Sequence, residues 1–129
     1  MNMKDERQFV GYSKYRSRLV DGHVHTELCP HGSGDRTALM IEKAIELRIE
    51  KVCLTEHAPL PKAFAAEYGG DQKAYDTASL KLNQVDSYLE LGRQLQRAYG
   101  THIDISLGFE VDYIPGFEAD IQEFLDRYG

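Results

Sequence analysis

This 129-residue chain is poor in cysteine and proline, and it has no long apolar run. Its two cysteines, Cys29 and Cys53, are too few for a disulfide framework, so we interpret both as reduced thiols of a cytosolic protein. No apolar stretch approaches the roughly 20 residues that a membrane-spanning helix needs. The polar segment 1–18 lacks the apolar centre of a signal peptide. We therefore expect a cytoplasmic protein that makes no contact with a membrane.

Basic residues are also scarce. The chain has 15 Lys and Arg against 21 Asp and Glu, which gives a formal charge of −6. A nucleic-acid-binding protein needs a basic surface to attract phosphate backbones, so we expect no nucleic-acid partner. A small phosphorylated substrate stays compatible with this charge, because bound metal cations can reverse the local field. The content of 42% hydrophobic and 28% charged residues is that of one small globular domain, or of part of a larger one.

Strand-like and helix-like segments alternate along the chain. Short apolar or alternating runs predict strands at 18–24, 51–55 and 103–111. Helical periodicity predicts helices at 36–49, at 76–99 and after Pro115-Gly116. Ser33-Gly34-Asp35 is expected to cap the first helix. The alternation is typical of parallel βαβ units, so the predicted fold class is α/β with three βα units.

Three of the five histidines stand close together between Asp21 and Asp35. His23 and His25 alternate, and on a strand this spacing directs both imidazoles to the same face. The turn that follows brings His31 back toward them. Neutral imidazoles gathered at the end of a strand are the outline of a metal site.

Two further candidates follow the other predicted strands. His57 comes after the second strand and Glu110 lies near the end of the third. In α/β barrels, functional residues gather where the strands end, so these side chains are expected to meet the histidine cluster. Imidazole and carboxylate groups suit divalent zinc, manganese or iron. The predicted metal ligands are His23, His25, His31, His57 and Glu110.

The residues around these candidates have alternative roles. Cys29 is either a further ligand or a buried structural thiol, whereas Cys53 is expected to face the core and His102 the surface. Glu110 and Asp112 share one face of a strand, so one is a ligand and the other a solvated or outer carboxylate. Nearby acidic residues are expected to orient the ligand imidazoles: Asp21, Glu27 and Glu56.

A pair of bound metal ions would suit the hydrolysis of a phosphate ester. Two ions held about 3.5–4 Å apart polarise a phosphoryl oxygen and lower the pKa of a bound water. Phosphate monoesters are among the slowest substrates to hydrolyse unaided, with enzymatic enhancements on the order of 10²¹. A cluster of metal charges is one of the few ways to supply that stabilisation, so the predicted activity is hydrolysis of a phosphate monoester. The general acid for the leaving alkoxide stays unassigned.

Three motifs resemble the polymerase and histidinol phosphatase (PHP) superfamily, and within it the histidinol-phosphate phosphatases. They are Asp21-Gly22-His23-Val24-His25 with Cys29-Pro30-His31-Gly32, then Leu54-Thr55-Glu56-His57-Ala58-Pro59, then Leu107-Gly108-Phe109-Glu110-Val111-Asp112. The resemblance implies the N-terminal part of a distorted (β/α)7 barrel over 19–129, with 1–18 as an extension. It also implies up to three metal ions and hydrolysis of L-histidinol phosphate to L-histidinol and phosphate in histidine biosynthesis. On the family pattern His23 and His25 bind one ion, Glu110 bridges to a second, and His31 and His57 serve the third.

The chain is much shorter than members of that family and has no counterpart of their later histidines and final Asp-x-His motif. We therefore expect the N-terminal half of such an enzyme, inactive or weakly active alone. An incomplete barrel exposes a sheet edge and apolar surface, so self-association is expected. Two alternatives stay open: a PHP phosphoesterase acting on another phosphate ester, and a non-catalytic module that binds metal or a partner chain.

Overall fold

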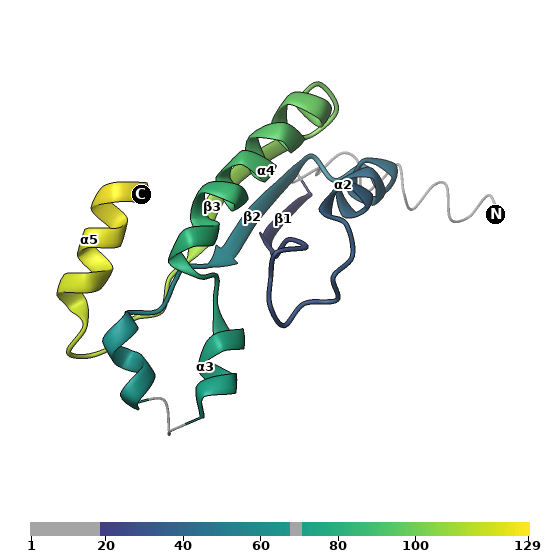
Figure 1. The fold of residues 1–129 in the computed structure, drawn as a ribbon. Coiled ribbons are helices and arrows are strands. Elements are labelled where there is room, and N and C mark those ends of the chain that lie inside the picture. Colours follow the sequence, from purple (N-terminus) through teal and green to yellow (C-terminus); the bar gives the residue numbers. More distant parts are fainter. Residues whose placement is uncertain (1–18, 68–70) are drawn as a thin grey trace, which may run out of the picture.

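A three-stranded parallel sheet organises the chain in the computed structural model, which describes residues 19–67 and 71–129 (Figure 1). The strands lie in the order β1-β2-β3. Their bounds are Val20–Val24 for β1, Lys51–His57 for β2 and Asp104–Glu110 for β3. The α/β class with parallel βα units is thereby confirmed. The predicted extension 1–18 falls outside the described residues.

Helical segments connect the strands. α2 (Thr37–Glu46) joins β1 to β2, and α5 (Glu118–Tyr128) follows β3. The connection from β2 to β3 contains η1 (Lys62–Glu67), α3 (Gln72–Ala78), η2 (Leu82–Gln84) and α4 (Val85–Tyr99). In Figure 1, η1 and α3 lie beyond the arrowhead of β2, and α5 is the yellow helix apart from α2. In the described part of the chain, no helix has the length and apolar character needed to cross a membrane.

The predicted single helix over 76–99 is wrong, because the chain leaves the helical conformation at Ser79. Ser79 is extended, with φ −152° and ψ 172°. Its Oγ accepts a hydrogen bond from the backbone N–H of Leu60 at 3.3 Å. Leu80 is buried, and its N–H donates to the carbonyl of His57 at 3.2 Å. Contacts with the segment after β2 therefore override a helical pattern that is continuous in the sequence.

The predicted cap of the first helix is also wrong. The helix begins after Arg36, which makes no side-chain capping bond. Instead the Glu27 carboxylate accepts from the backbone N–H of Thr37 at 2.7 Å, and the Thr37 hydroxyl oxygen accepts from the N–H of Glu27 at 3.1 Å. A carboxylate at a helix N-terminus satisfies a free donor and interacts favourably with the helix dipole. This cap ties the loop between β1 and α2, which contains His25 and His31, to the start of α2.

One face of the sheet is covered by helices and holds the core. Along β2, buried and half-buried residues alternate strictly, as expected when one face of a strand packs and the other does not. We call this buried side the covered face; it contains Val52, Leu54, Glu56 and Ile105. Ile41 of α2 and Tyr88 of α4 belong to the same buried group. Fully burying a side chain such as Leu54 contributes roughly 1.5–3 kcal/mol to folding.

The opposite side of the sheet, which we call the open face, carries small and polar residues. β2 and β3 pair in register, so side chains that face each other across the pair point the same way. The open face contains Cys53, Thr55 and His57 beside Ser106, Gly108 and Glu110. The prediction that Cys53 faces the core is wrong: it is half-buried on this open face.

An irregularity in β1 sets the direction of the first two histidines. Asp21 pairs with Val52 but Val24 pairs with Leu54, so β1 uses one residue more than β2 between these pairs. Val24 thereby joins the covered face, and His23 and His25 on either side of it point to the open face. In an unbroken register His23 would align with Leu54 on the covered face, since a shift of one residue reverses every side chain.

Candidate metal centre

Four of the predicted ligands meet at the carboxyl ends of the strands. Glu110 Oε2 lies 3.1 Å from His23 Nε2, 2.9 Å from His25 Nε2 and 3.3 Å from His57 Nδ1. The two Nε2 atoms of His23 and His25 are 3.1 Å apart. These donor atoms are spaced like neighbouring ligands of a single ion bonded at about 2.0–2.1 Å. One carboxylate oxygen at the end of β3 is thus surrounded by imidazoles from the ends of β1 and β2.

His31 completes a second group around the same imidazoles. Donor atoms of His25, His31 and His57 all lie within 4.8 Å of one another. The His31 ring centroid is 4.9 Å from that of His57. Its Nδ1 lies 2.7 Å from the carbonyl oxygen of Thr77 in α3, so Nδ1–H donates, and in the neutral imidazole Nε2 carries the lone pair. The structure brings all five predicted side chains together, and their role as ligands stays a prediction.

Two groups of the cluster, His57 and Glu110, have lowered pKa values. Burial lowers the pKa of His57, which favours the neutral imidazole that binds metals. Its buried Nδ1 lies 3.3 Å from Glu110 Oε2 and makes no hydrogen bond to a described residue. Burial raises the pKa of Glu110, but the hydrogen bond from His25 and the nearby histidine charges outweigh it and lower that pKa. Imidazole nitrogens and a carboxylate oxygen are the donor types that zinc, manganese and iron accept.

The acidic residues expected to orient the imidazoles make other contacts. Asp21 Oδ1 lies 3.4 Å from the backbone N–H of His23, and Glu27 caps α2. Glu56 accepts hydrogen bonds from the backbone N–H and the hydroxyl of Thr26. In the described part of the chain, no imidazole donates a hydrogen bond to these carboxylates, so that expectation is wrong in its direct form.

Cys29 lies beside the imidazole of His25. Its Sγ is 3.6 Å from His25 Nδ1, and the residue is buried. Burial raises the pKa of the Cys29 thiol, and the charge of Glu56 acts in the same direction.

His102 is exposed beside Thr101, as predicted. The contact between Thr77 and His31 had no sequence signal, because a backbone carbonyl is present at every position.

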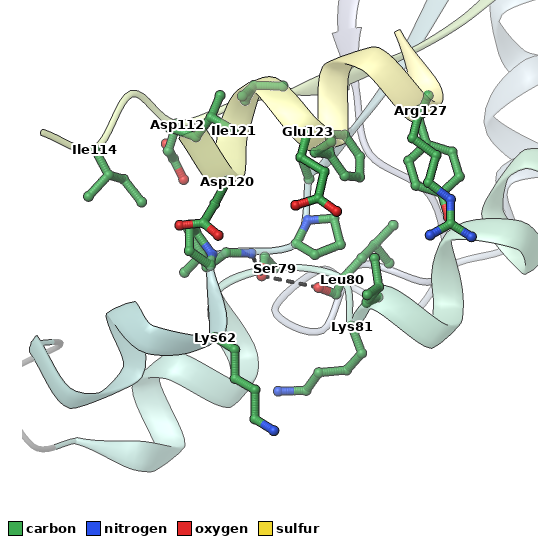
Figure 2. A pocket seen from close by; sticks show the side chains of 18 of the residues that line it. Lys62, Ser79, Leu80, Lys81, Asp112, Ile114, Asp120, Ile121, Glu123 and Arg127 are labelled. Carbon is green, nitrogen blue, oxygen red and sulfur yellow. Dashed lines mark hydrogen bonds between the residues drawn. The ribbon is translucent and has the colours of Figure 1, made fainter. Parts of the chain in front are cut away.

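A cavity of about 430 Å³ adjoins this centre. Ala58, which follows His57, and Asp112, which lies two residues after Glu110, are among the residues that line it. Figure 2 shows Asp120, Glu123 and Arg127 of α5 on one side of the cavity and Lys62 and Lys81 on the other. None of the five predicted ligands lines the cavity, so the histidine cluster and not the cavity supports a functional assignment.

The family follows from a comparison with known domains. The sequence pattern of the PHP domain family matches residues 21–129. The chain belongs to the PHP domain family. PHP domains are metal-dependent, and this PHP domain has histidine and glutamate groups that lie near one another.

Two curated relatives cover most of this PHP domain. The "Histidinol-phosphatase" of Bacillus subtilis (strain 168) is 40% identical over 109 residues, which are 84% of this chain and 39% of the relative. The "Probable histidinol-phosphatase" of Deinococcus radiodurans is 27% identical over 110 residues, 85% of this chain and 38% of the relative. The chain therefore spans about two fifths of the length of these proteins.

A solved structure supports the fold. The crystal structure of the "putative histidinol phosphatase hisK" from Listeria monocytogenes superposes with a TM-score of 0.81 at 39% sequence identity. The match covers 84% of this chain and 40% of that chain. The three βα units of this PHP domain thus correspond to part of a PHP (β/α) barrel, as the sequence motifs predicted.

Proposed function

We propose that this chain carries the N-terminal, metal-binding part of a PHP phosphatase that hydrolyses L-histidinol phosphate to L-histidinol and phosphate. The observation that carries the proposal is the meeting of imidazoles from β1 and β2 around one carboxylate oxygen of β3, at 2.9–3.3 Å. The names of the two curated relatives support the substrate and a role in histidine biosynthesis. The domain would extend over 19–129, in a cytoplasmic protein.

Divalent zinc, manganese or iron would be held by two overlapping sets of side chains. His23, His25 and Glu110 form one set, and His31 and His57 extend it on the side of α3. When bound, such ions polarise a phosphoryl oxygen and lower the pKa of a water. On the family pattern the site would take up to three ions, and Glu110 would be among the residues that hold them.

The chain's own residues prepare this site in three ways. The ionised carboxylate of Glu110 would offset the positive charge of a cation bound where the imidazoles converge. The carbonyl of Thr77 orients the imidazole of His31. The helix-packed covered face holds the ends of the strands at fixed spacing, so the ligands need little rearrangement.

Low activity and self-association are expected of these 129 residues by themselves. They include about two fifths of the length of the matched phosphatases. In the described chain, β1 and β3 each pair only with β2, so each has one unpaired edge. Unpaired parallel edges can add further strands, either from another chain or from a second copy.

The test combines metal binding with a substrate panel. Zinc and manganese are titrated into the metal-free chain by calorimetry, and phosphate release is then measured from L-histidinol phosphate, a nucleoside monophosphate and a sugar phosphate. We expect saturable metal binding and weak turnover that favours L-histidinol phosphate. Preference for another ester would support the broader PHP phosphoesterase. Metal binding without any turnover would support a non-catalytic module. Absence of metal binding would overturn the proposal, and rapid turnover by the monomer would contradict the expected incompleteness.

A further inference from the structure

Glu56 is a buried carboxylate that the proposed metal centre does not use. Its side chain is 0% exposed. Oε1 accepts hydrogen bonds from the backbone N–H and the hydroxyl of Thr26, the latter at 2.8 Å. Oε2 is buried without a hydrogen-bond partner among residues 19–67 and 71–129. An unpaired carboxylate oxygen is costly in the interior, so a donor close to Oε2 is required for the site to be satisfied.

Two side chains of the loop between β1 and α2 lie close to this carboxylate. Donor atoms of His25, Cys29 and Glu56 lie within 4.8 Å of one another. Cys29 is 6% exposed, and its Sγ is 3.6 Å from His25 Nδ1. His25 directs its other nitrogen, Nε2, toward Glu110 at 2.9 Å. The thiol therefore lies at the ring nitrogen that faces away from the proposed ligand cluster.

We propose that Cys29 and Glu56 are positioning residues for the metal ligand His25. In the metal-loaded chain, Nδ1–H of His25 donates to the Cys29 sulfur, and the thiol S–H donates to Oε2 of Glu56. This series of hydrogen bonds gives Oε2 of Glu56 a partner and, once a cation replaces the proton on Nε2, places the proton of His25 on Nδ1. The lone pair of Nε2 is then directed at the cation beside Glu110. The inference rests on the proposed metal centre and deepens it.

His31 provides an internal parallel. Its Nδ1 already donates to the carbonyl oxygen of Thr77 at 2.7 Å, which leaves Nε2 free in the same way. Partners of this kind fix the tautomer and orientation of a ligand imidazole, and their loss weakens metal binding by about 10–100-fold. His25 and His31 thus use acceptors of different chemistry for the same purpose, a thiol and a backbone carbonyl.

The test compares zinc affinity in three variants. Cys29→Ala removes the acceptor, and Glu56→Gln keeps the shape of the side chain while removing the charge. Cys53→Ala is the matched control, because Cys53 is the second free cysteine and belongs to no potential metal group in the described chain. We expect calorimetry to show zinc binding weakened about 10-fold or more in the first two variants and unchanged in the control. Circular dichroism checks that each variant is folded.

Two spectroscopic measurements separate positioning from other roles. In the zinc-loaded wild type, nitrogen-15 spectra of the histidines should show His25 protonated at Nδ1, and Cys29→Ala should make this proton exchange faster. Cobalt loading should give no intense sulfur-to-cobalt charge-transfer band. Such a band would overturn the inference, because Cys29 would then be a ligand.

Unchanged zinc affinity and unchanged Nδ1–H exchange in a folded Cys29→Ala chain would also overturn the inference, while the proposed metal centre would stand. If Glu56→Gln fails to fold, the Cys29→Ala comparison still decides the question. If the wild-type chain binds no zinc, the proposed function fails, and this inference fails with it.

Discussion

The two faces of the sheet differ in burial and in chemistry. On the covered face Leu54 is 0%, Val52 3% and Ile105 5% exposed, and α2 and α4 pack over them. On the open face Glu110 is 32% exposed at its side chain, and the neighbouring His23, which points the same way from β1, is 61% exposed. Alternation along each strand separates the two sets by a single residue. Buried apolar packing is therefore concentrated on one face and the proposed metal ligands on the other.

This separation has a physical reason. A metal ligand must keep a lone pair free and reachable, whereas a core residue gains its free energy by losing contact with water. Substitutions of apolar residues on the covered face should change the free energy of unfolding, and substitutions of the proposed ligands on the open face should change metal affinity. The following predictions test that division, beginning with the largest effect.

Leu54→Ala should lower the free energy of unfolding by about 2–5 kcal/mol, because it removes a fully buried side chain and leaves a cavity. Chemical denaturation of the metal-free chain measures the change. Cys53→Ala, at the adjacent position on the open face, should cost clearly less. Equal losses for the two variants would contradict the division of the faces.

Glu110→Gln should weaken zinc binding by more than about 100-fold, beyond the usual effect of a residue that only supports a ligand. The substitution removes the charge that three imidazoles approach within 3.3 Å. Calorimetry measures the affinity. Asp112→Asn is the matched control, since Asp112 lies two residues further along and lines the adjoining cavity. A larger loss in the control would make Asp112 the ligand instead.

Tyr88→Phe should destabilise the metal-free chain at neutral pH by about 1 kcal/mol, the usual net value of a hydrogen bond. The Tyr88 hydroxyl donates to the carbonyl of Gly108 at 2.6 Å from within the core. Zinc affinity per folded molecule should not change, because the phenol belongs to the covered side. Loss of zinc binding in a folded Phe variant would show that the two faces are coupled.

The same variant gives a pH dependence. Burial raises the pKa of Tyr88 to about 12 from 10.0, so the folded state retains the phenolic proton at a higher pH than the unfolded chain does. The contribution of this group is complete below pH 10.0 and is lost as the pH rises toward about 12. The stability of the wild type should therefore fall relative to that of Tyr88→Phe across this interval. Parallel curves would contradict a buried neutral phenol.

Ser106→Ala should have the smallest effect, within about 0.5 kcal/mol in stability. Ser106 is half-buried on the open face and pairs with Cys53, away from the helices. Thermal unfolding of the metal-free chain measures the change. A large loss would show that the open face also contributes packing energy.

Much of the fold could be predicted because the pattern of apolar residues is local. Three strand runs and the helix ending near Gly100 follow from periodicity and composition, and the order of these elements requires parallel connections. The break at Ser79 could not be predicted in this way, because it depends on hydrogen bonds to Leu60 and His57 from another part of the chain. The cap of α2 by Glu27 is likewise a contact between distant positions.

Residue types and their places after predicted strands were sufficient to nominate all five candidate ligands. The chain alone therefore determined the α/β class and nominated the side chains that we propose bind a cation. Only the tertiary structure decided which way they point. The extra residue between Asp21 and Val24 turns His23 and His25 to the open face, and this depends on how β1 pairs with β2. Register arises from contacts between strands, so a residue that looks equivalent in one strand can lie on either face until its neighbour is in place.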